Sequence, residues 1–161
     1  MKKLIFCNLL VAGLIMAGCD NKENEPTPVL NIDLVAFALD FELEKTQEFT
    51  GIVTITGTIK NIGDDFRSSQ GQQSVQLLEK PARQGKSIML DRKEFVDLNA
   101  GETIEVSFQR EWYSGMEFPP SFMVRVSYDP DIYLDGNELN DDSNNSNNTL
   151  ERSGQEISEM F

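Results

Sequence analysis

Short runs in which hydrophobic and polar residues alternate recur along the chain and predict β-strands. In residues 51–60, Val53, Ile55 and Ile59 fall on one face and threonines on the other, which is the two-residue period of a half-buried strand. The same alternation returns in residues 104–108 and 122–128. Shorter apolar runs at 75–78, 88–90 and 95–98 are bounded by turn residues such as Gly71, Pro81, Gly85 and Gly101.

The first apolar run, residues 30–43, changes its alternation part-way along. Ile32 and Leu34 share one face, whereas Phe37, Leu39, Phe41 and Leu43 share the other. A β-bulge, or a strand that crosses between two sheets, would produce this shift. Residues 44–50 are polar and predict a loop, and residues 61–65, which are rich in Asn, Gly and Asp, predict a turn.

No segment shows a convincing helical period, and the predicted strands are separated by closely spaced turn signals. We therefore expect an all-β fold, an antiparallel immunoglobulin-like β-sandwich of about seven to eight strands over residues 30–152. Residues 153–161 are then a C-terminal tail. The single tryptophan, Trp112, is expected to be a packing residue near a loop, the alternative being a sugar-stacking role.

The start of the chain has the layout of a secretion signal. Lys2 and Lys3 precede an apolar run over residues 4–16, which is too short for a transmembrane span. The sequence Ala17-Gly18-Cys19 that follows resembles the lipobox of bacterial lipoproteins, although Met16 replaces the usual leucine. The resemblance implies that residues 1–18 are removed and that Cys19 carries the lipid. An ordinary signal peptide or a buried helix is the alternative.

The residues after Cys19 support a lipid anchor. Residues 19–29 are polar, charged and proline-bearing, so they predict a flexible tether. The resemblance implies several acyl chains on one cysteine, which anchor a protein stably in a membrane. The two cysteines, Cys7 and Cys19, are then lost with the signal or consumed by lipid, so no disulfide is available to the exported domain.

Composition narrows the chemistry that the domain can perform. Removal of Lys2 and Lys3 leaves 12 basic residues against 27 acidic ones, a net charge of −15, which repels nucleic acid and anionic lipid headgroups. Histidine is absent, which excludes Ser-His-Asp and Cys-His nucleophiles and ordinary zinc sites. Carboxylate chemistry, for example by Glu111 or Glu117, is the enzymatic alternative that remains.

Several short motifs occur in an order that resembles a known family. A strand ending in Lys60-Asn61-Ile62-Gly63 is followed by Leu98-Asn99-Ala100-Gly101-Glu102-Thr103, by a strand over 124–128, and by an acidic, asparagine-rich stretch over 129–145. Together they resemble the CARDB domain, a cell-adhesion-related, immunoglobulin-like module found in bacteria. The resemblance covers about residues 30–150. It implies extracellular adhesion or contact with carbohydrate or protein, without naming a ligand.

The acidic stretch after the last long strand is a candidate metal site. Its oxygen-bearing side chains are dense enough for a calcium ion, and the predicted ligands are Asp129, Asp131, Asp135, Asn137 and Glu138. The EF-hand pattern fails, because Tyr133 occupies its third position and Asp142 replaces the final glutamate. The alternative is that these side chains hydrogen-bond to the backbone and stabilise turns.

Two functions fit these features. The first is a lipid-anchored extracytoplasmic binding or adhesion module without catalytic activity or a permanent cofactor. The second is a structural or accessory lipoprotein that scaffolds an envelope complex, with calcium as a possible stabiliser in either case. Residues 22–25 are similar to surface-export signals of the Bacteroidetes, whereas Asp20 would retain an enterobacterial lipoprotein at the inner membrane. We expect the outer membrane or the cell surface.

Overall fold

The computed structural model describes residues 29–83 and 85–161, and most of them form antiparallel strands. The predicted signal peptide, Cys19 and all of the tether except Val29 lie outside the described residues. In chain order the elements are β1 (Leu34–Lys45), β2 (Thr50–Asn61), β3 (Phe66–Arg67), β4 (Gln73–Lys80), β5 (Ile88–Glu94), β6 (Asp97–Leu98), β7 (Thr103–Tyr113), β8 (Ser121–Tyr128), η1 (Ile132–Leu134), η2 (Asn145–Asn147), β9 (Thr149–Ser153) and α1 (Gln155–Ser158).

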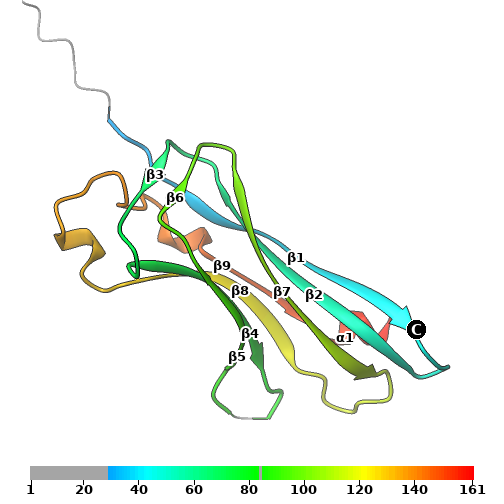
Figure 1. Cartoon of the computed structure of the whole chain (residues 1–161). Helices are drawn as coiled ribbons and strands as arrows, with labels where there is room; N and C mark the ends of the chain where they lie inside the picture. The colour runs from blue at the N-terminus through cyan, green and yellow to red at the C-terminus, as the bar shows by residue number, and fades with distance from the viewer. Residues whose placement is uncertain (1–28, 84) are drawn as a thin grey trace, which may run out of the picture.

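Two sheets form the layers of a sandwich (Figure 1). One has the strand order β1-β2-β7 and the other β5-β4-β8-β9, while the short strands β3 and β6 pair with each other near one end. All pairings are antiparallel. The predicted all-β sandwich is confirmed, and its seven strands of five residues or more fall within the predicted number. Among the described residues, no helix has the length and apolar character needed to cross a membrane.

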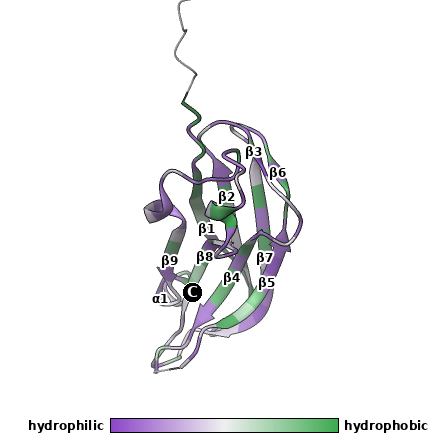
Figure 2. Ribbon diagram, turned by 90° about the vertical axis from the view of Figure 1, so that its left-hand side faces the viewer, coloured by the Kyte–Doolittle hydropathy of each residue, from purple (hydrophilic) through white to green (hydrophobic). Residues whose placement is uncertain are grey.

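The core lies between the two sheets and is formed by the faces that the alternation predicts. Val53, Ile55 and Ile59 of β2 are fully buried, as are Phe122 and Val124 of β8. Figure 2 shows this alternation of hydrophobic and hydrophilic residues along the strands. Gly57 continues the inward face of β2 at a point where the sheets approach closely, because a Cβ added there would lie 2.6 Å from the Val124 side chain.

The predicted irregularity in the first strand is a β-bulge. The register of β1 against β2 shifts between Ala36 and Ala38, so Phe37 has no partner. Leu39 is buried, and Phe41 is half-buried. Phe37 was expected on the same face but is 57% exposed, because the bulged residue turns outward, and the Lys60 ammonium lies 5.0 Å from its ring centroid.

One side chain of the facing sheet bonds to the backbone of each edge strand of the three-stranded sheet. The Asp91 carboxylate of β5 accepts a hydrogen bond from the backbone N–H of Ser107 in β7, at 3.2 Å. On the opposite edge, the Arg152 guanidinium of β9 donates to the backbone carbonyl of Leu39 in β1, at 2.5 Å. These bonds join the two layers along their open sides.

The last nine residues, expected as a tail, pack against the sandwich. Ile157 of α1 is fully buried, and Gly154 lies so close to Trp112 that a Cβ there would be 2.7 Å from the indole. The indole N–H of Trp112 donates to Ser158 Oγ at 3.1 Å, and the Lys45 ammonium donates to the Phe161 carbonyl at 2.7 Å. The segment therefore covers the end of the core next to the β1–β2 turn.

Candidate functional site

The end of the sandwich opposite Leu34 is built from two turns. The β1–β2 connection is shorter than the predicted loop and spans residues 46–49, while the β7–β8 connection spans residues 114–120. The backbone N–H of Ser114 donates to the Phe49 carbonyl at 2.9 Å, so the turns lie together. Twelve residues of β1 place this end roughly 36 Å from Leu34 at the usual rise per residue. We call it the distal end (Figure 1).

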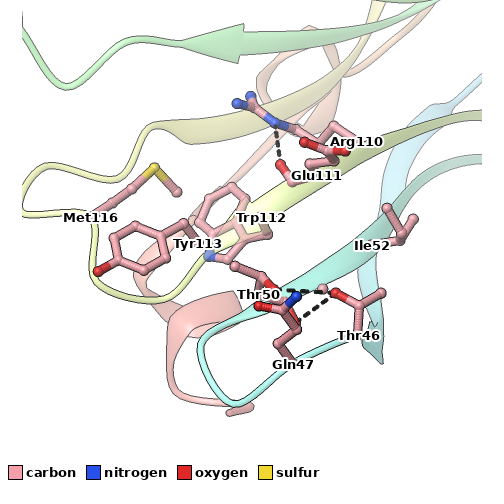
Figure 3. Close-up of a pocket in the computed structure, with 10 residues that line it drawn as sticks. Thr46, Gln47, Thr50, Ile52, Arg110, Glu111, Trp112, Tyr113 and Met116 are labelled. Carbon is pink, nitrogen blue, oxygen red and sulfur yellow. Dashed lines mark hydrogen bonds between the residues drawn. The ribbon is translucent and has the colours of Figure 1, made fainter.

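A hollow of about 580 Å³ opens at the distal end (Figure 3). The register places Thr50 beside Tyr113 and Ile52 beside Glu111, so residues far apart in the sequence share one face of β2 and β7. We call this hollow the distal pocket. It is lined by Thr46, Gln47, Thr50, Gly51, Ile52, Arg110, Glu111, Trp112, Tyr113 and Met116.

Three polar groups of the distal pocket are available for a ligand. Within the described part of the chain, the Glu111 carboxylate, the Gln47 side-chain amide and the Tyr113 hydroxyl form no hydrogen bond. Tyr113 is 54% exposed, so its ring offers an aromatic surface next to these groups. The distal pocket is therefore a concave site that places an aromatic ring beside a few polar groups free to bond a ligand.

Trp112 supports the pocket from beneath. It is 2% exposed, and its ring centroid lies 6.0 Å from that of Phe122. The Arg110 guanidinium lies 5.6 Å from the indole and forms an ion pair with Glu79 of the facing sheet. The prediction that Trp112 is a packing residue is confirmed. The exposed aromatic residue is its neighbour Tyr113, because successive residues of a strand point to opposite faces.

The pocket does not bring together the two carboxylates that glycoside hydrolysis uses. Of its lining residues, Glu111 alone is acidic. Glu117, the other acid considered, lies in the β7–β8 turn, is exposed and does not line the pocket.

The residues predicted to bind calcium lie in the connection between β8 and β9, where most are engaged in turns. Asp129 Oδ1 accepts the backbone N–H of Asp131 at 3.0 Å, and Asp135 Oδ1 accepts that of Asn137 at 2.7 Å. Asp135 Oδ2 also accepts hydrogen bonds from two side-chain amides, those of Gln72 and Asn140. The bonds from Asn140, Asn137 and Gln72 hold the pKa of Asp135 below its usual range.

Asn137 is likewise occupied, whereas Glu138 is exposed. Asn137 Oδ1 accepts the N–H of Leu139, and its Nδ2 donates to the Arg67 carbonyl at 2.8 Å. In residues 29–83 and 85–161 no group of three or more acidic side chains is placed to hold a metal ion. The hydrogen bonds agree with the turn interpretation, and calcium binding at these residues stays a prediction.

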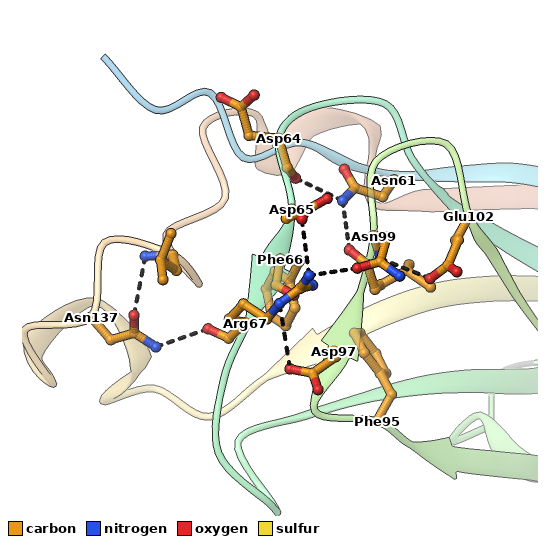
Figure 4. A network of polar contacts seen from close by, with 12 residues as sticks. Asn61, Asp64, Asp65, Phe66, Arg67, Phe95, Asp97, Asn99, Glu102 and Asn137 are labelled. Atoms are coloured by element: carbon orange, nitrogen blue, oxygen red, sulfur yellow. Dashed lines mark hydrogen bonds and ion pairs between the residues drawn. The ribbon is translucent and has the colours of Figure 1, made fainter. Parts of the chain in front are cut away.

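The two turns quoted for the family resemblance meet at one end of the sandwich (Figure 4). Asn61 is fully buried, and its Nδ2 donates to the carbonyls of Asp64 and Leu98 at 2.7 and 2.8 Å. The Arg67 guanidinium pairs with Asp65 at 2.9 Å and donates to Asn99 Oδ1 at 2.5 Å. Since Asn137 bonds the Arg67 carbonyl, this network also attaches the acidic connection to the sandwich.

Comparisons with known proteins give no close match. Neither the protein-family models nor the curated proteins give a match. The solved structures that are similar include β-glucosidase 3B from Thermotoga neapolitana in complex with glucose (18% identity, TM-score 0.31, covering 77% of this chain) and a β-glucosidase from Kluyveromyces marxianus (17%, 0.32 and 77%). The chain spans only 16% and 14% of those chains. A likeness this weak carries no argument about activity.

Proposed function

We propose that this chain is a lipid-anchored extracytoplasmic binding or adhesion module without catalytic activity. The observation that carries the proposal is the position of the distal pocket. A lipid on Cys19 would tether the N-terminal end of β1 to a membrane, and the pocket lies at the other end of the sandwich. Such an arrangement presents the pocket away from the membrane, where a partner at the cell envelope can reach it.

The pocket's chemistry supports binding rather than catalysis. It combines one free carboxylate, one free amide and a half-exposed tyrosine ring, and these groups suit hydrogen bonding and stacking to a protein or a carbohydrate. Thr46 and Gln47 come from a tight turn, while Thr50, Glu111 and Tyr113 come from long strands. These elements fix the backbone positions of the pocket without a ligand, which limits the backbone entropy lost on binding.

Retention of cells on coated surfaces tests the proposal. Cells producing the full-length chain are compared with cells that produce Tyr113→Ala or Glu111→Gln, on surfaces coated with polysaccharide or with protein. The pocket variants are expected to lose retention on one coating. Phe37→Ala, which removes a similarly exposed aromatic ring from β1, is the matched control and should retain it. If cells producing the wild type and the three variants carry equal amounts of the protein on their surface and are retained equally, the proposal is contradicted.

A second candidate, an accessory lipoprotein that scaffolds an envelope complex, is favoured by two phenylalanines at the distal end. Phe49 and Phe118, one in each turn, are 55% and 50% exposed, and aromatic residues are enriched in protein–protein interfaces. Protease treatment of intact cells separates the candidates. Cleavage without permeabilisation supports a surface module, whereas cleavage only after permeabilisation supports the scaffold. Cys19→Ser should release either form from the membrane.

A further inference from the structure

Arg125 differs from the other arginines of the described chain in how its charge is balanced. Four arginines lie within 4.0 Å of a carboxylate, namely Arg67, Arg92, Arg110 and Arg152. The Arg83 guanidinium lies 4.6 Å from the Phe118 ring centroid. Arg125, on the outer face of β8, has no carboxylate at that distance within residues 29–83 and 85–161, although the chain is strongly acidic.

A buried neutral amide fixes the Arg125 guanidinium in place. Gln76 lies directly across from Arg125 on β4, is 8% exposed, and accepts hydrogen bonds from Nε and Nη2 at 3.0 and 2.8 Å. The Gln76 amide in turn donates to Ser74 Oγ at 3.2 Å, and Ser74 is 2% exposed. The side chain is therefore held by a neutral group that orients it without neutralising it.

These bonds leave one side of the guanidinium free. Gln76 occupies the edge formed by Nε and Nη2, so the end formed by Nη1 and Nη2 retains N–H donors in the parallel geometry that binds two oxygens of one anion. Thr149 lies across from Arg125 on β9, and Ser127 lies two residues along the same face of β8. Neither hydroxyl forms a hydrogen bond within the described residues.

We propose that Arg125, Ser127 and Thr149 form a binding site for an oxyanion, either a carboxylate or a phosphate group. The three side chains line a hollow of about 380 Å³ that is bounded by Tyr133 and Asn145 of the β8–β9 connection. The site shares no residue with the distal pocket. Residues 19–161 carry a net charge of −15, which repels polyanions at long range, so the site suits a ligand that carries a single oxyanion.

Nuclear magnetic resonance tests the site directly, through the Arg125 Nε–Hε signal and the amide signals of Ser127 and Thr149. The mature chain, residues 19–161 with Cys19→Ser, is titrated with sodium acetate and with sodium phosphate, while sodium chloride keeps the ionic strength constant. Saturable shifts of these signals are expected with at least one of the two anions. The anion that binds more tightly identifies the preferred group.

Variants separate a built site from general attraction of anions. Arg125→Gln should weaken binding by at least about ten-fold, the equivalent of one strong charge-assisted hydrogen bond. Arg83→Gln makes the same change in net charge at an exposed arginine and should leave the affinity unchanged. Gln76→Leu keeps the charge but frees the guanidinium, and Arg125→Lys keeps the charge but loses the paired donors, so both should weaken binding.

Three results would overturn the proposal. One is the absence of saturable shifts with either anion, and another is the same shifts with chloride alone. The third is equal weakening by Arg83→Gln and Arg125→Gln, which would indicate screening of the whole surface. Loss of cell retention in the distal-pocket variants is a separate readout, so failure of this site and failure of the proposed function can be told apart.

Discussion

Replacing Tyr128 by phenylalanine tests how the acidic connection between β8 and β9 is held to the sandwich. The Tyr128 hydroxyl donates to Asp142 Oδ2 at 2.7 Å, and Asp142 is 5% exposed. The same carboxylate accepts hydrogen bonds from the Asn148 side chain at 2.9 Å and from the Asn144 backbone N–H at 3.0 Å. The substitution removes one of these three donors and leaves the aromatic ring in place.

The stability that Tyr128→Phe loses follows from the charge and burial of Asp142. A hydrogen bond to a charged group contributes about 1.5–3 kcal/mol, and a buried acceptor that loses its donor costs a similar amount. Tyr128→Phe is therefore expected to lower the free energy of unfolding by about 2 kcal/mol near neutral pH. Asn148 and Asn144 continue to stabilise the carboxylate, so the chain should still fold.

The hydrogen bond between Tyr128 and Asp142 should also make the free energy of unfolding depend on pH in the alkaline range. Burial, followed by the charge of Asp142, raises the pKa of Tyr128. A tyrosine in the unfolded chain titrates near pH 10, so the folded state keeps a proton that the unfolded state loses. The resulting stability is complete below about pH 10 and falls by about 1.4 kcal/mol for each pH unit above it. The difference between the wild type and Tyr128→Phe should therefore shrink between pH 10 and 11.

Urea unfolding at pH 8, 10 and 11 measures both effects. Tyr133→Phe is the matched control, because the Tyr133 hydroxyl donates to the neutral Asn145 at 2.8 Å and its side chain is 43% exposed. That variant should lose less than about 1 kcal/mol. A loss below about 0.5 kcal/mol for Tyr128→Phe at pH 8, the usual range for surface substitutions, would refute the reasoning. So would a difference that stays constant up to pH 11.

Three further predictions concern the metal, the C-terminal helix and acid stability. If calcium binds the acidic connection, the unfolding temperature of residues 19–161 with Cys19→Ser is higher with calcium than with a chelator, and Asp131→Asn with Asp135→Asn removes the difference. Identical curves leave these residues in their turn role alone. Ile157→Ala should cost about 2–5 kcal/mol in urea unfolding because the side chain is fully buried, and a smaller loss than about 1 kcal/mol would show that α1 does not cover the core. Hydrogen bonds from Arg152 lower the pKa of Glu156, so the ionised Glu156 side chain stabilises the folded state above about pH 4.3 and this stabilisation is lost as the pH falls further. Glu156→Gln should therefore make the free energy of unfolding less dependent on pH below about pH 4.3, and an unchanged pH dependence would contradict this.

The strands could be predicted because their residues alternate. Val53, Ile55 and Ile59 of β2 face the core, and the residues that alternate with them lie on the opposite face, so the pattern shows which face of the strand is buried. The bulge in β1 was visible for the same reason, since the inward set changes parity between Ala36 and Leu39. The outward position of Phe37 was not, because alternation does not show which residue is the extra one.

The features of the fold and of the distal pocket that could not be predicted depend on contacts between residues far apart in the sequence. The two-residue strand β3 was not predicted, and it pairs with β6, which lies within the predicted run at 95–98, where Phe66 meets Leu98 far along the chain. Helix α1 has only four residues and is stabilised by the burial of Ile157 rather than by a helical period. The distal pocket depends on a register that sets Thr50 beside Tyr113. The exposed position of Tyr113 was implicit in its neighbour, since a buried Trp112 in a strand requires the next side chain to point away.

The bonds that Asp91 and Arg152 make to the outer edges of β7 and β1 affect how neighbouring copies of the domain can meet when they are crowded on a membrane. Lipid anchors, as proposed, would confine many copies to one membrane plane in a similar orientation, and their sheet edges would meet far more often than in free solution. A bare edge strand is a template for strand addition and for aggregation. Here a carboxylate already accepts the Ser107 N–H, and a guanidinium already donates to the Leu39 carbonyl. Each edge of the three-stranded sheet therefore has one backbone group fewer that a neighbouring copy could use for strand addition.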